Sequence, residues 1–276
     1  MSCCDRAGAP ADGGGVSSSL LSAAARVPLY AEPDCEPQRV LDQVQGWTMQ
    51  LRVRVAPDAS PFARLRLLNH FFFGELGFAG ADDGYRSAQC SYLHRVIERR
   101  RGIPITLSIL YMELGRAAGL RLEGVSFPGH FLVRLPLSAG IVFIDVHGGG
   151  ATLSTDDLRQ RLRAMLPGEA DPPLAAYLRP ATEQEILARM LRNLKAIHWQ
   201  AQQWAAALAV VDRLVGLQPG SPRERLDRAQ LYERLECPRA AVDDLAAYLS
   251  LAPSSPDATE VRRRLARLRQ AVARLH

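Results

Sequence analysis

The C-terminal third of the chain repeats itself with a period of 34 residues. An alanine-rich apolar segment that ends in Pro219 is echoed by a second segment that ends in Pro253. The same offset relates Ala207 to Ala241. A period of this length is typical of a helix–turn–helix unit in which small residues let neighbouring helices pack closely. The predicted repeats cover residues 184–218 and 219–252, and a polar, arginine-rich closing helix covers 257–274.

The residues best suited to chemistry lie in the stretch 94–150. Apolar residues at helical spacing from Pro104 onward predict a buried helix, and proline is well tolerated in its first turn. Three short strand-like segments follow. His130 begins the second segment, Asp145 lies in the third, and His147 comes two residues later. A helix followed by a histidine strand and an aspartate strand is the layout of an acyl-transfer site with a cysteine nucleophile.

The remaining apolar, glycine and proline residues predict where the chain divides into domains. Apolar residues at helical spacing predict further helices over residues 36–55, 62–76 and 92–101. The glycines at 148–150 predict the end of the sheet, and prolines mark a linker further on. The predicted divisions are a disordered tail over 1–18, a helix-and-sheet domain over 19–165, a linker over 166–181 and a helical domain over 182–276.

The composition bears on compartment and on metal binding. The five cysteines are odd in number and scattered, and no C-x-x-C spacing suggests a zinc site. The N-terminal residues lack the apolar core of a signal peptide, and no later run approaches the length of a membrane span. We therefore expect a cytoplasmic protein with free thiols, no membrane association and no cofactor.

The charge of the chain permits an acidic partner without requiring one. The formal net charge is +5. A nucleic-acid surface usually concentrates basic residues on one face and interleaves them with aromatic residues. A tight basic run lies at 99–101, with Arg95 one turn earlier, and a solvent-facing helix also explains it. We do not expect nucleic-acid binding.

The sequence GIPITLSILYMELGRAAGL, at 102–120, is followed by GVSFPGHFLVR at 124–134. Together they resemble the transglutaminase-like domain of the bacterial SirB-type family, and a related domain occurs in certain F-box proteins. In that family the domain precedes tetratricopeptide repeats, and the present chain resembles this arrangement from about residue 36 to its end. The resemblance implies a papain-like α+β core in which a helix packs on a small antiparallel sheet. It identifies the region 19–165 as the transglutaminase-like domain.

The resemblance also implies where a nucleophile would stand. In active transglutaminase-like enzymes a cysteine begins the central helix. Counting back from Gly119 places that position near Pro104, within 102–105, and none of these residues is a nucleophile. His130 and Asp145 match the second and third positions of the family's site. The resemblance thus implies a base and its orienting carboxylate without the group that they would activate.

Three residues offer substitutes for the missing cysteine. Thr106 and Ser108 lie in the first turns of the central helix, whose N-terminus stabilises negative charge. Cys90 is the thiol in the middle of this domain, although a free cysteine is most often a small buried apolar residue. The resemblance implies asparagine at positions 90 and 94, where this chain has Cys90 and His94.

A metal site is a further interpretation of the same stretch. Asp145 and His147 are two residues apart, so on a strand they point to one face. With His130 they offer three ligands to zinc and leave a fourth position open. The purely structural interpretation is that His130 and Asp145 form a hydrogen bond with each other, because a carboxylate inside an apolar strand needs a hydrogen-bond partner.

We therefore predict an α+β transglutaminase-like domain without its nucleophile, joined to an all-α domain of the tetratricopeptide-repeat type. The predicted function is that of a non-catalytic cytoplasmic adaptor or regulator that binds a protein or peptide through the groove of the helical repeats, the former active-site cleft of the transglutaminase-like domain, or both. The alternative is a hydrolase or acyl transferase that uses His130 and Asp145 with a substituted nucleophile, or a metal-assisted hydrolase.

Overall fold

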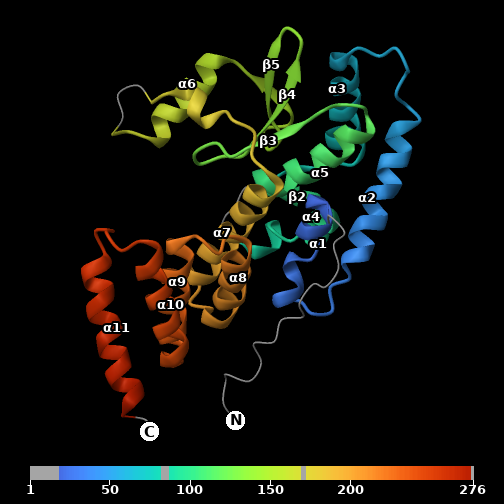
Figure 1. The fold of residues 1–276 in the computed structure, drawn as a ribbon. Helices are drawn as coiled ribbons and strands as arrows, with labels where there is room; N and C mark the ends of the chain where they lie inside the picture. Colours follow the sequence, from blue (N-terminus) through green and yellow to red (C-terminus); the bar gives the residue numbers. More distant parts are fainter. Residues whose placement is uncertain (1–18, 82–86, 169–171, 275–276) are drawn as a thin grey trace. The chain divides into compact units, whose positions relative to one another are not determined.

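The computed structural model describes residues 19–81, 87–168 and 172–274. The predicted disordered tail lies outside these residues. The chain forms two compact units, shown in Figure 1, and the boundary between them falls after Asn193. We call residues 19–193 the helix-and-sheet unit and the part from Leu194 onward the helical unit. The boundary lies inside helix α7 (Glu183–Gln200), so one continuous helix contributes to both units.

The helix-and-sheet unit contains α-helices, short 3-10 helices and a π-helix. The α-helices are α1 (Leu20–Ala25), α2 (Pro37–Arg52), α3 (Pro61–Asn69), α4 (Leu93–Arg99), α5 (Pro104–Ala117) and α6 (Thr155–Met165). The 3-10 helices are η2 (Val27–Tyr30), η4 (Ala88–Cys90) and η5 (Leu174–Tyr177). The predicted helix over 62–76 is present, but its second half, His70–Glu75, is a π-helix, η3, instead of an α-helix.

Helix α5 is the centre of this unit. Eleven of its 14 residues are buried, so it is apolar on nearly every side, as expected of a core helix. It contacts the helices α1 to α4 and strands of the neighbouring sheets. Pro104 occupies the first turn, as predicted. Gly115 admits a close neighbour, because a Cβ atom there would lie 2.3 Å from the Leu122 side chain.

A four-stranded antiparallel sheet follows α5. Its strands are β3 (Glu123–Val125), β4 (Leu132–Leu137), β5 (Gly140–Asp145) and β6 (Ala151–Leu153), in that order. The sequence predicts the first three strands, but the predicted end of the sheet at 148–150 is wrong. Gly149 and Gly150 have φ angles of 74° and 79°, a left-handed conformation that glycine adopts at little cost, and they turn the chain into β6.

One face of the sheet packs against helix α6. Leu132 and Phe143 share one face, which packs against Leu158 and Leu162 of helix α6. Asp145 lies two residues after Phe143 on β5, so strand alternation directs its side chain to the same face. A separate parallel pair is formed by β1 (Ala79–Gly80) and β2 (Arg101–Gly102), and β2 lies just before α5 in the chain.

The helical unit contains the predicted repeats. After the end of α7 come α8 (Trp204–Leu217), α9 (Pro222–Arg234), α10 (Pro238–Leu251) and α11 (Ala258–Ala273). Ala207 and Ala241, 34 residues apart, are fully buried at equivalent packing positions. Gln202 and Glu236 are also 34 residues apart, and both turn between helices with a left-handed φ, 55° and 57°. The repeat prediction and its closing helix are confirmed.

Candidate functional site

His130 lies in a tight turn before β4 rather than on the predicted strand. Its backbone N–H donates to the Phe127 carbonyl (3.2 Å), and Gly129 has a φ of 66° that suits such a turn. The carbonyl of His130 accepts a hydrogen bond from Arg189 Nη2 (2.7 Å). The backbone on both sides of the imidazole is therefore held in place.

Asp145, the last residue of β5, meets this imidazole. His130 Nε2 lies 2.8 Å from Asp145 Oδ1. The Asp145 side chain is 6% exposed and that of His130 is 21% exposed, so the pair is shielded but reachable. Because Nε2 faces the carboxylate, Nδ1 is the ring nitrogen left on the opposite side of the imidazole. The two residues that the sequence singles out are brought together.

Asp145 has two further partners, which its position in the sequence does not reveal. Arg161 Nη1 donates to Oδ2 (2.8 Å), and the Gly148 N–H donates to Oδ1 (3.0 Å). Burial opposes ionisation of Asp145, but the hydrogen bond and charge of His130, with those of Arg161 and Gly148, hold its pKa well below the usual range. A capping box of Ser154 and Asp157 fixes the start of α6 and so places Arg161, one turn further, opposite β5.

His147 lies beside His130, but not because it shares a strand face with Asp145 as predicted. Strand β5 ends at Asp145, so alternation does not apply to His147, which lies in the following turn. Its ring packs edge-on against His130, with centroids 5.9 Å apart. It also fills the space at Gly80, where a Cβ atom would lie 2.5 Å from His147 Nε2. Gly80 pairs with Gly102, so His147 connects the His130 ring to the strands that precede α5.

The geometry does not gather ligands for a metal. Over the described ranges of the chain, no three side chains of His, Cys, Asp or Glu are placed to hold a metal ion. Asp145 instead uses both carboxylate oxygens on donors, Oδ1 on His130 and Gly148 and Oδ2 on Arg161. The metal interpretation of His130, Asp145 and His147 therefore has no geometric support.

The three residues that could replace the missing cysteine as nucleophile, Thr106, Ser108 and Cys90, are buried in the core of the domain. Thr106 Oγ1 lies 3.0 Å from the carbonyl oxygens of Cys90 and Ile103, so its hydroxyl closes the turn before α5. Cys90 is only 6% exposed, and Ser108 is fully buried. Among the described residues, no cysteine, serine or threonine side chain is hydrogen-bonded to the His130 ring.

The arginine run around Arg100 does not form a basic patch. Arg100 has a left-handed φ of 58° and turns back onto the core, where its guanidinium lies 4.7 Å from the Trp47 ring centroid and 4.9 Å from that of Phe78. Arg95 is paired with Glu32 (3.0 Å) and with a glutamate one turn along α4. Arg100 and Arg95 therefore contact different neighbours and do not present their positive charges together on one surface.

Comparison with known proteins agrees with this architecture. The family model of the transglutaminase-like superfamily matches residues 38–192, and a tetratricopeptide-repeat model matches residues 194–266. A UPF0162 protein of Xylella fastidiosa (strain Temecula1) is 38% identical over 245 residues, which cover 88% of this chain and 87% of the relative. A UPF0162 protein of Pseudomonas aeruginosa is 32% identical over 252 residues, or 91% and 89% of the two chains.

A third relative carries a different name. Protein SirB1 of Salmonella typhimurium is 25% identical over 232 residues, which cover 83% of this chain and 85% of the relative. No solved structure shows a significant match. The chain therefore belongs to the transglutaminase-like superfamily and, within it, to the SirB-type family that includes the UPF0162 proteins. The resemblance of residues 102–134 to this family is confirmed.

Proposed function

We propose that the protein is a non-catalytic cytoplasmic adaptor or regulator that binds a protein or peptide. Its transglutaminase-like domain retains His130 and Asp145 as a structural remnant of the family's site, and its helical unit binds the partner. Tetratricopeptide repeats commonly mediate protein interactions. Cys35 is a free thiol, which suits a reducing compartment. In the parts of the chain that the structure describes, no helix combines the length and apolar content needed to cross a bilayer.

The observation that supports the non-catalytic proposal most is the set of hydrogen bonds that the Asp145 carboxylate accepts. Its carboxylate accepts hydrogen bonds from His130, Arg161 and Gly148, and these donors suffice to stabilise it within the sheet. A catalytic pair needs a nucleophile in contact with the base. At the helix start, Pro104 provides neither thiol nor hydroxyl. The pair therefore has a sufficient structural reason to persist.

A cavity in the helical unit is the surface that we propose for the partner. It has a volume of about 470 Å³ and is lined by Trp199, three arginines, Gln230 and Glu233. Trp199 packs edge-on against Trp204, with ring centroids 5.9 Å apart. Arg264 is held by Glu233 through an ion pair of 2.5 Å. An aromatic wall beside arginines is the composition of interface hot spots.

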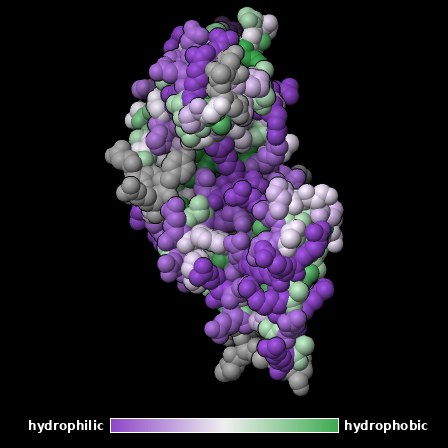
Figure 2. Space-filling model, turned by 90° about the vertical axis from the view of Figure 1, so that its left-hand side faces the viewer, coloured by the Kyte–Doolittle hydropathy of each residue, from purple (hydrophilic) through white to green (hydrophobic). Residues whose placement is uncertain are grey.

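The charge of α11 indicates an acidic partner. The helix contains five arginines and a single acidic residue, Glu260. Arg267 is exposed and lines the cavity. Figure 2 views the molecule from the side on which α11 lies in Figure 1, and hydrophilic residues predominate on this surface. An acidic segment of a protein, rather than an apolar helix, is the complement of such a surface.

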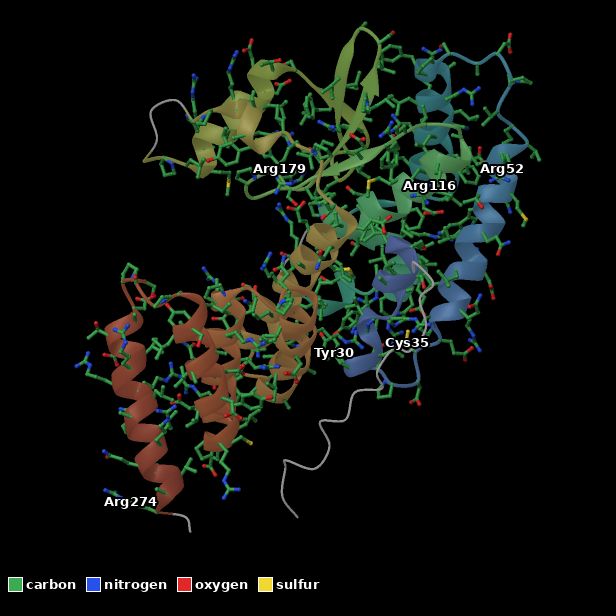
Figure 3. The ribbon with its side chains drawn as sticks, in the orientation of Figure 1. Tyr30, Cys35, Arg52, Arg116, Arg179 and Arg274 are labelled. Carbon is green, nitrogen blue, oxygen red and sulfur yellow. The ribbon has the colours of Figure 1, made fainter. Side chains whose placement is uncertain are left out.

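The test is affinity capture from native lysate with the full chain and the Arg267→Glu variant. The charge reversal is expected to weaken binding of the captured partner about tenfold, which corresponds to ~1.4 kcal/mol. Arg52→Glu is the matched control, because Arg52 is exposed on α2 in the other unit (Figure 3) and the change in net charge is the same. Equal loss with both variants would mean that net charge alone attracts the partner, and no loss with Arg267→Glu would overturn the proposed surface.

The catalytic alternative rests on one observation, the 2.8 Å contact between His130 and Asp145. This contact orients an imidazole as a general base requires. A hydrolase or acyl transferase would still need a nucleophile brought by a conformational change or a partner. Loss of a measurable acyl-transfer activity on His130→Ala, at unchanged thermal stability, would favour this alternative over the adaptor.

A further inference from the structure

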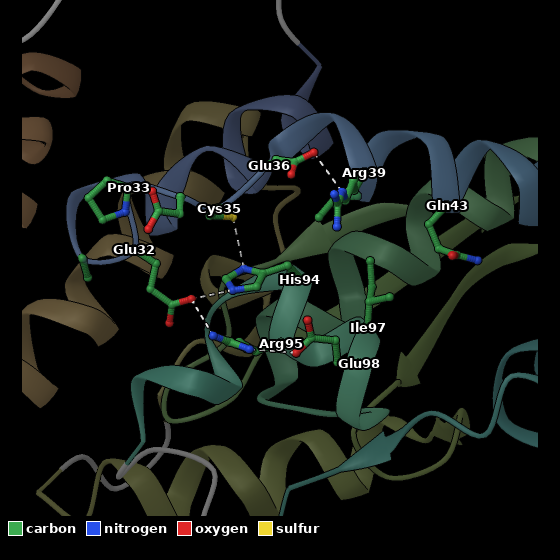
Figure 4. A pocket seen from close by; sticks show the side chains of 13 residues that line it. Glu32, Pro33, Cys35, Glu36, Arg39, Gln43, His94, Arg95, Ile97 and Glu98 are labelled. Carbon is green, nitrogen blue, oxygen red and sulfur yellow. Dashed lines mark hydrogen bonds and ion pairs between the residues drawn. The ribbon is translucent and has the colours of Figure 1, made fainter.

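A second cluster of reactive side chains lies at a cavity of about 560 Å³ in the helix-and-sheet unit. The cavity lies between the segment that precedes α2 and helix α4, and Figure 4 shows its lining. This volume is in the range of sites for small molecules. Three of the lining residues, Glu32, Cys35 and His94, form a connected chain of contacts. None of them contributes to the pair of His130 and Asp145.

The sequence places Glu32 and Cys35 together by a turn. The four residues Glu-Pro-Asp-Cys end with a hydrogen bond from the Cys35 N–H to the Glu32 carbonyl (3.0 Å). Proline at the second position presets the backbone of such a turn. Helix α2 starts two residues after Cys35. The thiol and the carboxylate are therefore presented on the same side by local structure alone.

His94 connects the two groups through opposite nitrogens of its ring. Nδ1 lies 3.5 Å from Cys35 Sγ, and Nε2 lies 2.8 Å from Glu32 Oε2. The ring also stacks on Tyr92, with centroids 6.1 Å apart and planes 10° apart. A carboxylate accepts hydrogen bonds only, so Nε2 carries the ring proton and Nδ1 offers its lone pair to the thiol. This is the tautomer that a general base needs.

The carboxylate has partners that keep it charged. Glu32 accepts hydrogen bonds from His94, from Arg95 Nη2 (3.0 Å) and from Gln89 Nε2 (3.3 Å). Burial raises the pKa of Glu32, but these three hydrogen bonds outweigh it and lower the pKa overall. An ionised Glu32 both orients the imidazole and stabilises the imidazolium that forms when it takes a proton.

We propose that Cys35, His94 and Glu32 form a nucleophilic thiol site that accepts an acyl group from an activated ester or thioester. The constellation is a nucleophile in contact with a base, which a third group orients. Cys35 and His94 both line the cavity, and Cys35 is partly exposed to it. The proposal goes beyond the adaptor function and involves different residues.

The chemistry balances within these residues and the substrate. His94 Nδ1 takes the proton of the Cys35 thiol as sulfur forms a bond to the acyl carbon. The bond from that carbon to the leaving oxygen or sulfur then breaks, and the leaving atom receives the proton from His94. The products are S-acyl Cys35 and a free alcohol or thiol.

The surroundings of Cys35 disfavour its thiolate form. Burial and the negative charge of Glu32 raise the pKa of Cys35, and Glu98 and Glu36 add to this while Arg95 opposes it. Attack therefore depends on proton transfer to His94 during the reaction. This dependence makes His94 the residue whose removal separates a working site from a merely exposed thiol.

The test uses p-nitrophenyl acetate on the full chain, with Cys3→Ser and Cys4→Ser in every sample to remove the two N-terminal thiols. Release of p-nitrophenol is followed in time, and peptide mapping locates the acetyl group. We expect acetylation of Cys35 about 100-fold faster than that of Cys237, another partly exposed cysteine. His94→Gln, which has no base to offer, is expected to reduce the rate at Cys35 to that of Cys237.

Two controls keep the outcome decisive. Cys237→Ser is expected to leave the rate at Cys35 unchanged, and Cys35→Ser is expected to remove the fast phase while partner capture persists. Equal acetylation rates at Cys35 and Cys237 in the parent protein would overturn the proposal even if the His94 variant failed to fold. An unchanged rate in a folded His94→Gln variant would overturn it as well.

Discussion

The guanidinium of Arg161 donates to the oxygen of Asp145 that His130 does not use, at 2.8 Å. Strand β5 and helix α6 are thereby joined by a charge pair at the point where the family's acyl-transfer chemistry would be found. The pair packs beside the apolar contact of the sheet with Leu158 and Leu162. The site residues of this domain thus contribute to holding helix and sheet together.

Replacement of Asp145 by asparagine is expected to destabilise the protein by about 2–4 kcal/mol at neutral pH, because Arg161 and His130 lose a buried charged partner. The folded-state pKa of Asp145 is depressed, so its stabilisation is complete above the unfolded pKa of about 4 and is lost as the pH falls through the lower folded value. The difference in the free energy of unfolding between parent and variant should therefore shrink towards acid. Urea unfolding at pH 7 and at pH 3 measures it, and a constant difference would contradict the assignment.

Alanine at Gly150 is expected to cost much more stability than alanine at Gly149. Both glycines have a left-handed φ, so either substitution carries a backbone cost of about 1–2 kcal/mol. At Gly150 the new Cβ would also lie 2.6 Å from Phe73 and 2.7 Å from Asn69 Oδ1, whereas at Gly149 it meets nothing within 4 Å. Overpacking adds about 1–3 kcal/mol. Thermal unfolding of the two variants side by side measures the difference, and equal losses would show that the turn before β6 is not closely packed.

In the helical unit, Asp244→Ala is expected to be strongly destabilising. Asp244 is buried and accepts hydrogen bonds from Arg225 (3.0 Å) and from two nitrogens of Arg228 (2.6 and 2.7 Å). Its removal leaves two partly buried guanidinium groups without this acceptor, at a cost of about 3–5 kcal/mol. The neighbouring Asp243 is exposed, and Asp243→Ala should change stability by no more than about 0.5 kcal/mol. Similar urea midpoints for the two variants would refute this account of how α9 and α10 are joined.

Periodicity predicts the parts of this fold that depend on local pattern. The central helix beginning at Pro104 and the repeats marked by Ala207 and Ala241 follow from apolar and small residues at regular spacing. The contact of Asp145 with Arg161 does not, because it depends on the face to which β5 directs its side chain and on where α6 begins. Strand β6 could not be predicted from the sequence, because it is only three residues long and comes directly after a run of three glycines, which is typical of a turn.

The cluster at the second cavity is even less visible in the sequence. Cys35 and His94 are 59 positions apart, in segments that carry no shared motif. The turn that places Glu32 beside Cys35 is a local signal, with proline at its second position. Only the packing of α4 against α2 brings the imidazole to the thiol. Tertiary packing therefore creates this site, and no spacing rule would find it.

The most direct measurement is the affinity of the captured partner for the full chain and for its His130→Ala variant, with far-ultraviolet circular dichroism to confirm folding. If the His130–Asp145 pair is a structural remnant, the dissociation constants should agree within about threefold, a difference of ~0.6 kcal/mol. The partner should also leave the incubation chemically unchanged with either protein. A partner that the parent cleaves or acylates, and that the His130→Ala variant leaves intact, would contradict the non-catalytic account.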